Sequence, residues 1–352
     1  MINQLRKLVM GSAITSSILS LILAFLFSGL VLLLAGYSPV AAYGAIAQGA
    51  FGDLDALANT LAKATPIMFT GLAVAIAFRG GLFNIGAEGQ LYLGAFTAAI
   101  VGIYLNGLPG VIHIVVVMIA AGLVGSAWSF LAGFIKVKWR AHEVIVTIML
   151  NYIAILLTEY LVNYVFKAEG MVPRTEMVAK SVYLPQLVPH SQLTIGIFFA
   201  IAACLFMYWF FRYHVYGYEI RAIGLNPTAA KTGGINHGKR IMLTMAISGF
   251  VAALAGAVEV IGVHHYFING LSPGYGFDGI AVAVLGRNNP IGVIFSAILF
   301  GALRAGGMRL DRSTEIPADF VIIIQALVII FVATPWVIKV IKSKKKGGEK
   351  IG

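Results

Sequence analysis

The sequence has one cysteine, Cys204, among 352 residues, and only 11% of its residues are charged. A single thiol excludes a disulfide within the chain and a metal site built from several thiolates. So few charges cannot cover the surface of a water-soluble globule of this length. No nucleophile, base and orienting group recur together, and metal-ligand spacing is absent, which argues against a membrane enzyme and against a metal site.

Apolar residues are abundant instead: the sequence is 59% hydrophobic, contains 40 glycines and has a mean hydropathy of +0.91. They form continuous runs of about twenty residues, the length of a membrane-crossing helix, rather than alternating strands of about ten. The sequence therefore predicts an all-α fold, a polytopic membrane bundle.

The net charge of +11 is not the footprint of a nucleic-acid-binding protein, because the basic residues lie between the apolar runs and in the tail. Lys136, Lys138 and Arg140 mark a cytoplasmic loop, whereas the loop with Asp53 and Asp55 has no Lys or Arg and is expected outside. This alternation predicts that both termini are cytoplasmic.

Ten membrane segments follow from the apolar runs and the charges. A single span between residues 277 and 303 would leave the Lys-rich C-terminus outside, so we expect two half-helices there, 277–286 and 291–303. Residues 1–338 then form one transmembrane domain with a cytoplasmic segment at 212–240, and residues 339–352 form a basic cytoplasmic tail. The other expected segments are 14–36, 58–78, 85–105, 111–135, 143–166, 193–211, 241–263 and 320–338.

Glu88 stands near the start of the third expected segment, where a carboxylate is unusual. At helix-centre depth it costs roughly 2.5 to 3.5 kcal/mol, so its presence indicates a function or a specific partner. The topology places it about one turn into a helix, with Asn84 as the expected cap and Arg79 within reach. We favour a structural clasp between Glu88 and Arg79 over a role in gating or in the pathway.

Small residues recur every four positions in segments 85–105, 111–135 and 241–263, which favours close helix packing over lining of a path. The segment at 143–166 has a polar stripe instead: Glu143, Thr147, Asn151 and, after an interruption, Glu159. This stripe fits either hydrogen bonding between helices or a substrate pathway, and both readings stay open. The candidate pathway residues are Asn84, Glu88, Gln90, Thr147 and Asn151.

Residues 233–239 have the spacing of a phosphate-binding loop. However, Arg240 follows where a Ser or Thr should hold magnesium, and no strand precedes the glycines. We therefore expect no cofactor in this chain.

Three motifs carry a resemblance to a known family. The string GLFNIGAEGQ at 81–90 closely resembles the signature of permease subunits of ABC importers in the branched-chain amino acid and simple-sugar group. RAIGLNP at 221–227 is similar to that family's cytoplasmic coupling segment, and AVAVLGRNNPIG at 281–292 is similar to its hairpin of half-helices. The resemblance implies that the residues contacting the ATPase are Arg221, Gly224, Asn226, Pro227, Ala229, Ala230, Gly234 and Ile235.

Within that family, HEVIVTIMLNY at 142–152 resembles the nucleoside-uptake branch. The resemblance implies uptake of purine nucleosides such as guanosine through a bacterial inner membrane. It also implies three partners: a second permease, expected to be a different chain; an ATP-binding subunit that holds ATP and magnesium; and an extracytoplasmic binding protein or lipoprotein. The alternatives are import of ribose-type sugars or branched-chain amino acids, or an ion-coupled secondary transporter whose buried carboxylates bind ions.

The expected mechanism is alternating access, in which closure of the ATPase pushes on residues 226–235. Asn226 and Pro227 can begin a short helix there, and Gly233 and Gly234 can end it, which would suit a helix-in-groove contact. Charges of the external loops are expected to dock the binding protein: Asp53, Asp55, Glu169, Arg174 and Glu176.

Overall fold

The computed structural model describes residues 19–105, 107–317 and 319–333 of the chain, and these residues form helices without named strands. They divide into two compact units. The predicted basic tail, 339–352, lies outside the described residues. So do residues 14–18 of the first predicted segment and residues 334–338 of the last.

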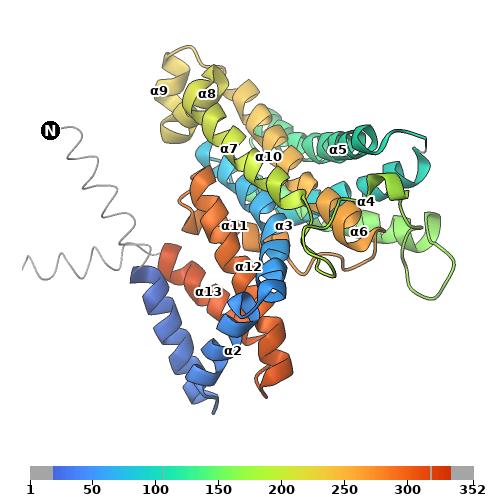
Figure 1. Cartoon of the computed structure of the whole chain (residues 1–352). Coiled ribbons are helices and arrows are strands. Elements are labelled where there is room, and N and C mark those ends of the chain that lie inside the picture. Colours follow the sequence, from blue (N-terminus) through green and yellow to red (C-terminus); the bar gives the residue numbers. More distant parts are fainter. Residues whose placement is uncertain (1–18, 106, 318, 334–352) are drawn as a thin grey trace, which may run out of the picture. The chain divides into compact units, whose positions relative to one another are not determined.

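The larger unit, Asp53–Ala302, is a bundle in which α10 packs against α3, α4 and α5 (Figure 1). Most of α3 and α10 is buried, whereas only about a quarter of α5 and α6 is buried. Its elements are α3 (Leu54–Arg79), α4 (Ala87–Tyr104), α5 (Gly110–Trp139), α6 (Glu143–Tyr160), the π-helix η1 (Leu161–Val165), the 3-10 helix η2 (Lys180–Val182), α7 (Gly196–Tyr213), α8 (Val215–Leu225), α9 (Pro227–Thr232), α10 (His237–Glu259), the π-helix η3 (Val260–His264), α11 (Tyr275–Leu285) and the first half of α12 (Pro290–Ser313).

Small residues let α10 lie close to its neighbours, as the stripes predicted. A side chain at Gly94 of α4 would overlap the backbone of Ala253, and one at Gly125 of α5 would meet the Ala253 side chain and the carbonyl of Gly249. Backbones at this distance gain dispersion contacts that larger residues would prevent. Helix packing is therefore one role of these stripes.

The smaller unit contains the helix Leu19–Leu34, α2 (Pro39–Phe51), α12 from Leu303 onward and α13 (Phe320–Ala333). Its core joins apolar side chains of all four, and the Tyr43 hydroxyl donates to the carbonyl of Phe25 over 2.6 Å.

The stretch between the first two predicted segments is helical, although the sequence was expected to form a loop there. Ser38 caps α2 through the Ala41 amide at 3.4 Å, and Pro39 occupies the first helical position. Ala42, Ala45, Ile46 and Gly49 then form its buried face. These four residues recur with the spacing of a helix, which indicates a helix even though the stretch is too short to be recognised as a membrane segment.

The predicted length of the second half-helix, 291–303, is also wrong, because α12 continues to Ser313. Leu303 and Leu310, seven residues apart, are both buried in the smaller unit and continue one apolar face past Arg304. In contrast, α11 has only 11 residues, as expected of a half-helix. Among the described helices, six are long and apolar enough to cross a membrane. The full count of ten segments and the orientation of the termini stay predictions.

Candidate functional site

The segment predicted to contact an ATPase forms two short helices, α8 and α9, at one end of the larger unit (Figure 1). Asn226 separates them: its Oδ1 accepts a hydrogen bond from the Ala229 amide at 3.0 Å, and Pro227 begins α9. Gly233 ends α9, and Gly234 follows with a φ of +85°. The predicted short helix between Asn226-Pro227 and the two glycines is confirmed.

This pair of helices presents apolar side chains to the exterior. Leu225 is 87% exposed, and Val215 and Tyr218 are also exposed. Within α9 the buried residue is Ala230, and Ile235 beyond it is half-buried and donates its amide to the Ala230 carbonyl at 3.1 Å. Exposed apolar groups on short capped helices are typical of a surface that binds a groove.

Gly224 of α8 packs directly on the turn that follows α3. A Cβ at Gly224 would overlap the carbonyl of Arg79 and lie 2.9 Å from the Gly81 amide nitrogen. The Arg79 side chain extends from this turn toward Asn288 and Phe211. Its Nε donates to the carbonyl of Asn288 at 2.5 Å, and its guanidinium lies 4.8 Å from the centre of the Phe211 ring. The start of the string 81–90 and the segment 221–227 are thus in contact.

An ion pair between Glu219 of α8 and Arg240 of α10 ties the two helices together. The Arg240 guanidinium also lies 4.1 Å from the centre of the Tyr216 ring, so Arg240 contacts two side chains of α8. Arg221 is half-buried, and its Nε has no hydrogen-bond partner in the described part of the chain.

Glu88 lies inside the larger unit and is 3% exposed. Its Oε2 accepts a hydrogen bond of 2.5 Å from the Gly276 amide, in the first turn of α11. The predicted clasp with Arg79 is wrong, because Arg79 stays at the end of α3 and binds Asn288 and Phe211 instead. A carboxylate is favoured near a helix N-terminus, and Glu88 lies near two of them, in the first turn of α4 and against the first turn of α11.

Asn84 and Gln90 form a reciprocal pair of amide hydrogen bonds, each 3.0 Å long. Asn84 also donates to Ser248 Oγ at 2.8 Å, and Ser248 donates to the carbonyl of Ala73 at 2.6 Å. The N-cap of α4 is Gly86, not Asn84 as expected, although Asn84 accepts from the Gly86 amide at 3.1 Å. The amide oxygen and nitrogen of Asn84 bond α4 and α10, and Ser248 extends this network to α3, so Asn84 joins helices rather than ending one.

Thr147 and Asn151 connect α6 to the same region. Asn151 Oδ1 accepts from the Gly89 amide at 2.5 Å, and Thr147 Oγ1 accepts from the Ile85 amide at 3.3 Å. The five candidate pathway residues therefore gather around the start of α4, all buried. Their part in transport stays a prediction.

The polar stripe of α6 does not continue to Glu159. The buried face passes through Ala154 and Thr158, because a helix of 3.6 residues per turn drifts from a strict spacing of four. Glu159 is half-buried and accepts from Asn269 at 3.0 Å.

Sequence reasoning missed two members of this site, Ser248 and Gly276. Ser248 is a lone hydroxyl in an apolar helix, and Gly276 belongs to a glycine-rich entry into α11; each offers a local signal but no indication of its partner.

The five charges predicted to dock a binding protein are all exposed, so the structure leaves them accessible. Asp53 also caps α3 through the Ala56 amide at 2.7 Å, and the Arg174 guanidinium lies 5.0 Å from the centre of the Tyr266 ring. Docking at these residues stays a prediction.

Residues 56–333 match the family described as branched-chain amino acid transport system / permease component. The chain belongs to this permease family. The guanosine ABC transporter permease protein NupP of Bacillus subtilis (strain 168) is 39% identical to the permease, covering 94% of this chain and 96% of the relative. The nucleoside ABC transporter permease protein NupB of Lactococcus lactis subsp. cremoris (strain MG1363) is 32% identical, covering 94% and 93%.

A third relative is the glucose ABC transporter permease protein TsgB13 of Haloferax volcanii, 31% identical over 90% of this chain and 86% of the relative. No solved structure matches the permease. The permease is thus a multi-pass membrane component of an ABC transporter system, a transport subunit rather than an enzyme. Such a system includes an ATPase and a binding protein as partners.

Proposed function

We propose that the permease imports nucleosides, in particular purine nucleosides such as guanosine, across the bacterial inner membrane. The observation that carries this proposal is the relative named for guanosine, whose similarity extends over nearly all of both chains. The similarity to a second relative, named for nucleosides, supports the same substrate class.

A sugar is the second candidate, because one relative of similar identity is named for glucose. The two substrate classes make different predictions for competition. In cells whose guanosine uptake depends on this permease, unlabelled adenosine or guanosine should reduce uptake of labelled guanosine, whereas ribose, glucose and leucine should not. Competition by a sugar or by leucine alone would contradict the nucleoside assignment.

We further propose that α8, α9 and the turn after them bind the ATPase, through the segment with Arg221, Gly224, Asn226, Pro227, Ala229, Ala230, Gly234 and Ile235. Ala230 is buried and would support this contact from within. The exposed apolar surface of this pair supports the proposal, since a short helix with such a face suits a groove. Gly224, packed on the corner at Arg79, would pass a displacement of α8 to the rest of the larger unit. ATP and magnesium are assigned to the partner, so this chain would need no cofactor.

Alternating access then requires a second permease, which we propose is a different chain, and delivery of substrate by an extracytoplasmic binding protein or lipoprotein. An ion-coupled transporter is the competing mechanism. Deleting the ATPase gene should abolish guanosine uptake, while an uncoupler applied with ATP maintained should not; the opposite pattern would support ion coupling.

The buried polar residues around the start of α4 are proposed to border the substrate path: Asn84, Glu88, Gln90, Thr147 and Asn151. Their hydrogen bonds between α4, α6, α10 and α11 support an additional role in holding these helices together. If they border the path, Glu88→Gln should change the concentration for half-maximal guanosine uptake. Unchanged uptake by a well-folded variant would remove Glu88 from the path.

A further inference from the structure

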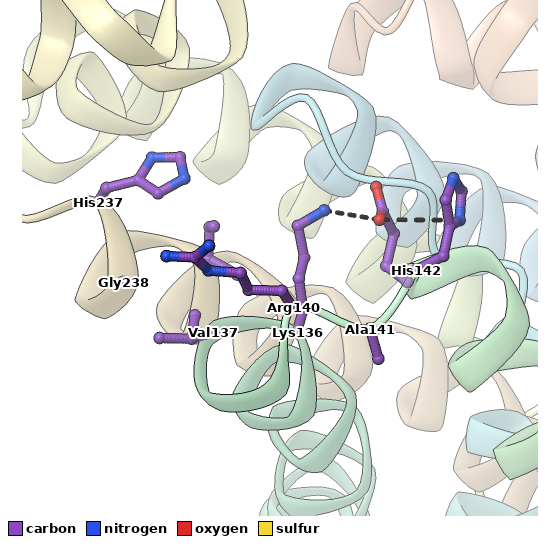
Figure 2. Close-up of a pocket in the computed structure, with 9 residues that line it drawn as sticks. Lys136, Val137, Arg140, Ala141, His142, His237 and Gly238 are labelled. Carbon is purple, nitrogen blue, oxygen red and sulfur yellow. Dashed lines mark hydrogen bonds and ion pairs between the residues drawn. The ribbon is translucent and has the colours of Figure 1, made fainter.

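A cavity of about 580 Å³ lies where the last turn of α5 meets the starts of α6 and α10 (Figure 2). Four basic residues line it: Lys136, Arg140, His142 and His237. The proposed transport function assigns no role to this cavity. Because α6 and α10 both begin here, the positive ends of their helix dipoles add positive potential.

One carboxylate, Glu143, also lines the cavity, and it is neutralised locally. Lys136 Nζ lies 2.6 Å from Glu143 Oε2, and His142 Nδ1 lies 4.0 Å from the same oxygen. Figure 2 shows the Arg140 guanidinium extending from α5 toward the side formed by His237 and Gly238, away from this cluster. Arg140 therefore supplies the positive charge that remains for a ligand, and the His237 ring supplies a further polar group.

Two observations distinguish His237 and Arg140. The Nδ1 atom of His237 is buried and has no hydrogen-bond partner in the residues that the structure describes. Arg140 ends α5 in the left-handed region, with a φ of +55°, where glycine is the usual residue. A backbone position that favours glycine nevertheless holds an arginine.

We propose that this cavity binds the phosphate headgroup of an anionic membrane lipid, with Arg140 as the main contact. Basic pockets between membrane helices at the cytoplasmic surface are suited to such headgroups. The cytoplasmic placement rests on the proposed coupling role of α8 and α9, because α10 begins directly after α9.

A lipid fits better than a soluble anion because the same helices offer apolar surface for acyl chains. Val137 lines the cavity, and Phe130, seven residues earlier on α5, is exposed. Ile145 and Met149, four apart on α6, are also exposed. Trp139 is 60% exposed at the end of α5, which is the usual place for tryptophan at a membrane interface.

The test measures binding of fluorescent phosphatidylglycerol to the purified whole transporter in detergent. Arg140→Gly is the decisive variant, since glycine suits the backbone there while the guanidinium is lost. Lys138→Gln is the matched control: it removes one charge from the same turn, but Lys138 lies over the rings of Phe134 and Trp139 and does not line the cavity.

We expect Arg140→Gly to raise the half-saturating lipid concentration about fivefold, and Lys138→Gln to change it by less than about twofold. ATPase activity of the assembled transporter confirms that both variants fold. Equal weakening by the two variants would show general surface attraction and overturn the proposal. Displacement of the labelled lipid by inorganic phosphate as effectively as by unlabelled phosphatidylglycerol would assign the site to a soluble anion and also overturn the proposal. Because the readout is lipid binding, a wrong nucleoside assignment would leave it unaffected.

Discussion

Replacing Gly224 by alanine tests whether the contact between α8 and the corner after α3 carries coupling. The added Cβ would lie 2.9 Å from both the carbonyl carbon of Arg79 and the amide nitrogen of Gly81, and it would overlap the Arg79 oxygen. Ordinary contacts of a Cβ begin near 3.4 Å. All three neighbours are backbone atoms, so they cannot rotate away. Because the overlap with the Arg79 oxygen is the largest, either α8 or the corner must move by about one ångström.

Two effects on the free energy of unfolding oppose each other at this position. Alanine is favoured over glycine in a helix by about 0.5 to 1 kcal/mol. Overpacking against backbone costs about 1 to 3 kcal/mol. The net loss is then on the order of 1 kcal/mol, small enough for the protein to fold. A displaced α8 should therefore affect transport more than stability.

The assay compares guanosine uptake and ATP hydrolysis by the assembled transporter in proteoliposomes. We expect Gly224→Ala to retain ATP hydrolysis while uptake per ATP falls several-fold. Gly233→Ala is the control: its Cβ would lie 3.5 Å from the nearest carbonyl oxygens, an ordinary contact, so uptake should be unchanged. Wild-type uptake per ATP in a well-expressed Gly224→Ala variant would refute the reasoning.

Three further substitutions test other contacts. Asn226→Ala removes the cap of α9 and should destabilise that helix by about 1 kcal/mol. The expected result is lower guanosine uptake at an unchanged level of the permease in the membrane. Ser248→Ala removes one partner of the Asn84 amide and should lower the unfolding free energy by about 1 to 3 kcal/mol; a thermal midpoint equal to wild type would contradict this. Gly276→Ala places a Cβ against the backbone of Glu88 and should reduce thermal stability more than Ser248→Ala does, and the reverse order would count against the tight approach of α11 to α4.

Local signals predicted the parts of this fold that depend on neighbours in sequence. Asn226 and Pro227 begin α9, and the glycines after it end it, because capping needs only residues within one turn. The apolar runs located the long helices for a similar reason: the membrane requires continuous hydrophobicity of a fixed length. The helix α2 was missed because it is too short for that criterion.

Partners far apart in sequence were not predictable in this way. Arg79 and Glu88 are nine residues apart and opposite in charge, so the sequence suggested an ion pair, yet each contacts a residue about 190 to 210 positions away. These distant partners are backbone groups, the carbonyl of Asn288 and the amide of Gly276, which nearly every residue of a sequence possesses. A pattern of side chains therefore contains no signal for them.

These two long-range contacts together explain how the short helix α11 is placed. Its 11 residues span about 16 Å, roughly half of the hydrocarbon layer, so the membrane alone does not fix its depth. Glu88 holds its first turn, and Arg79 holds the turn after its last residue. Because the Arg79 carbonyl also contacts Gly224, the residue that fixes one end of α11 is the one on which α8 rests. A displacement of α8 can therefore reach α11 through a single residue, Arg79, the last residue of α3.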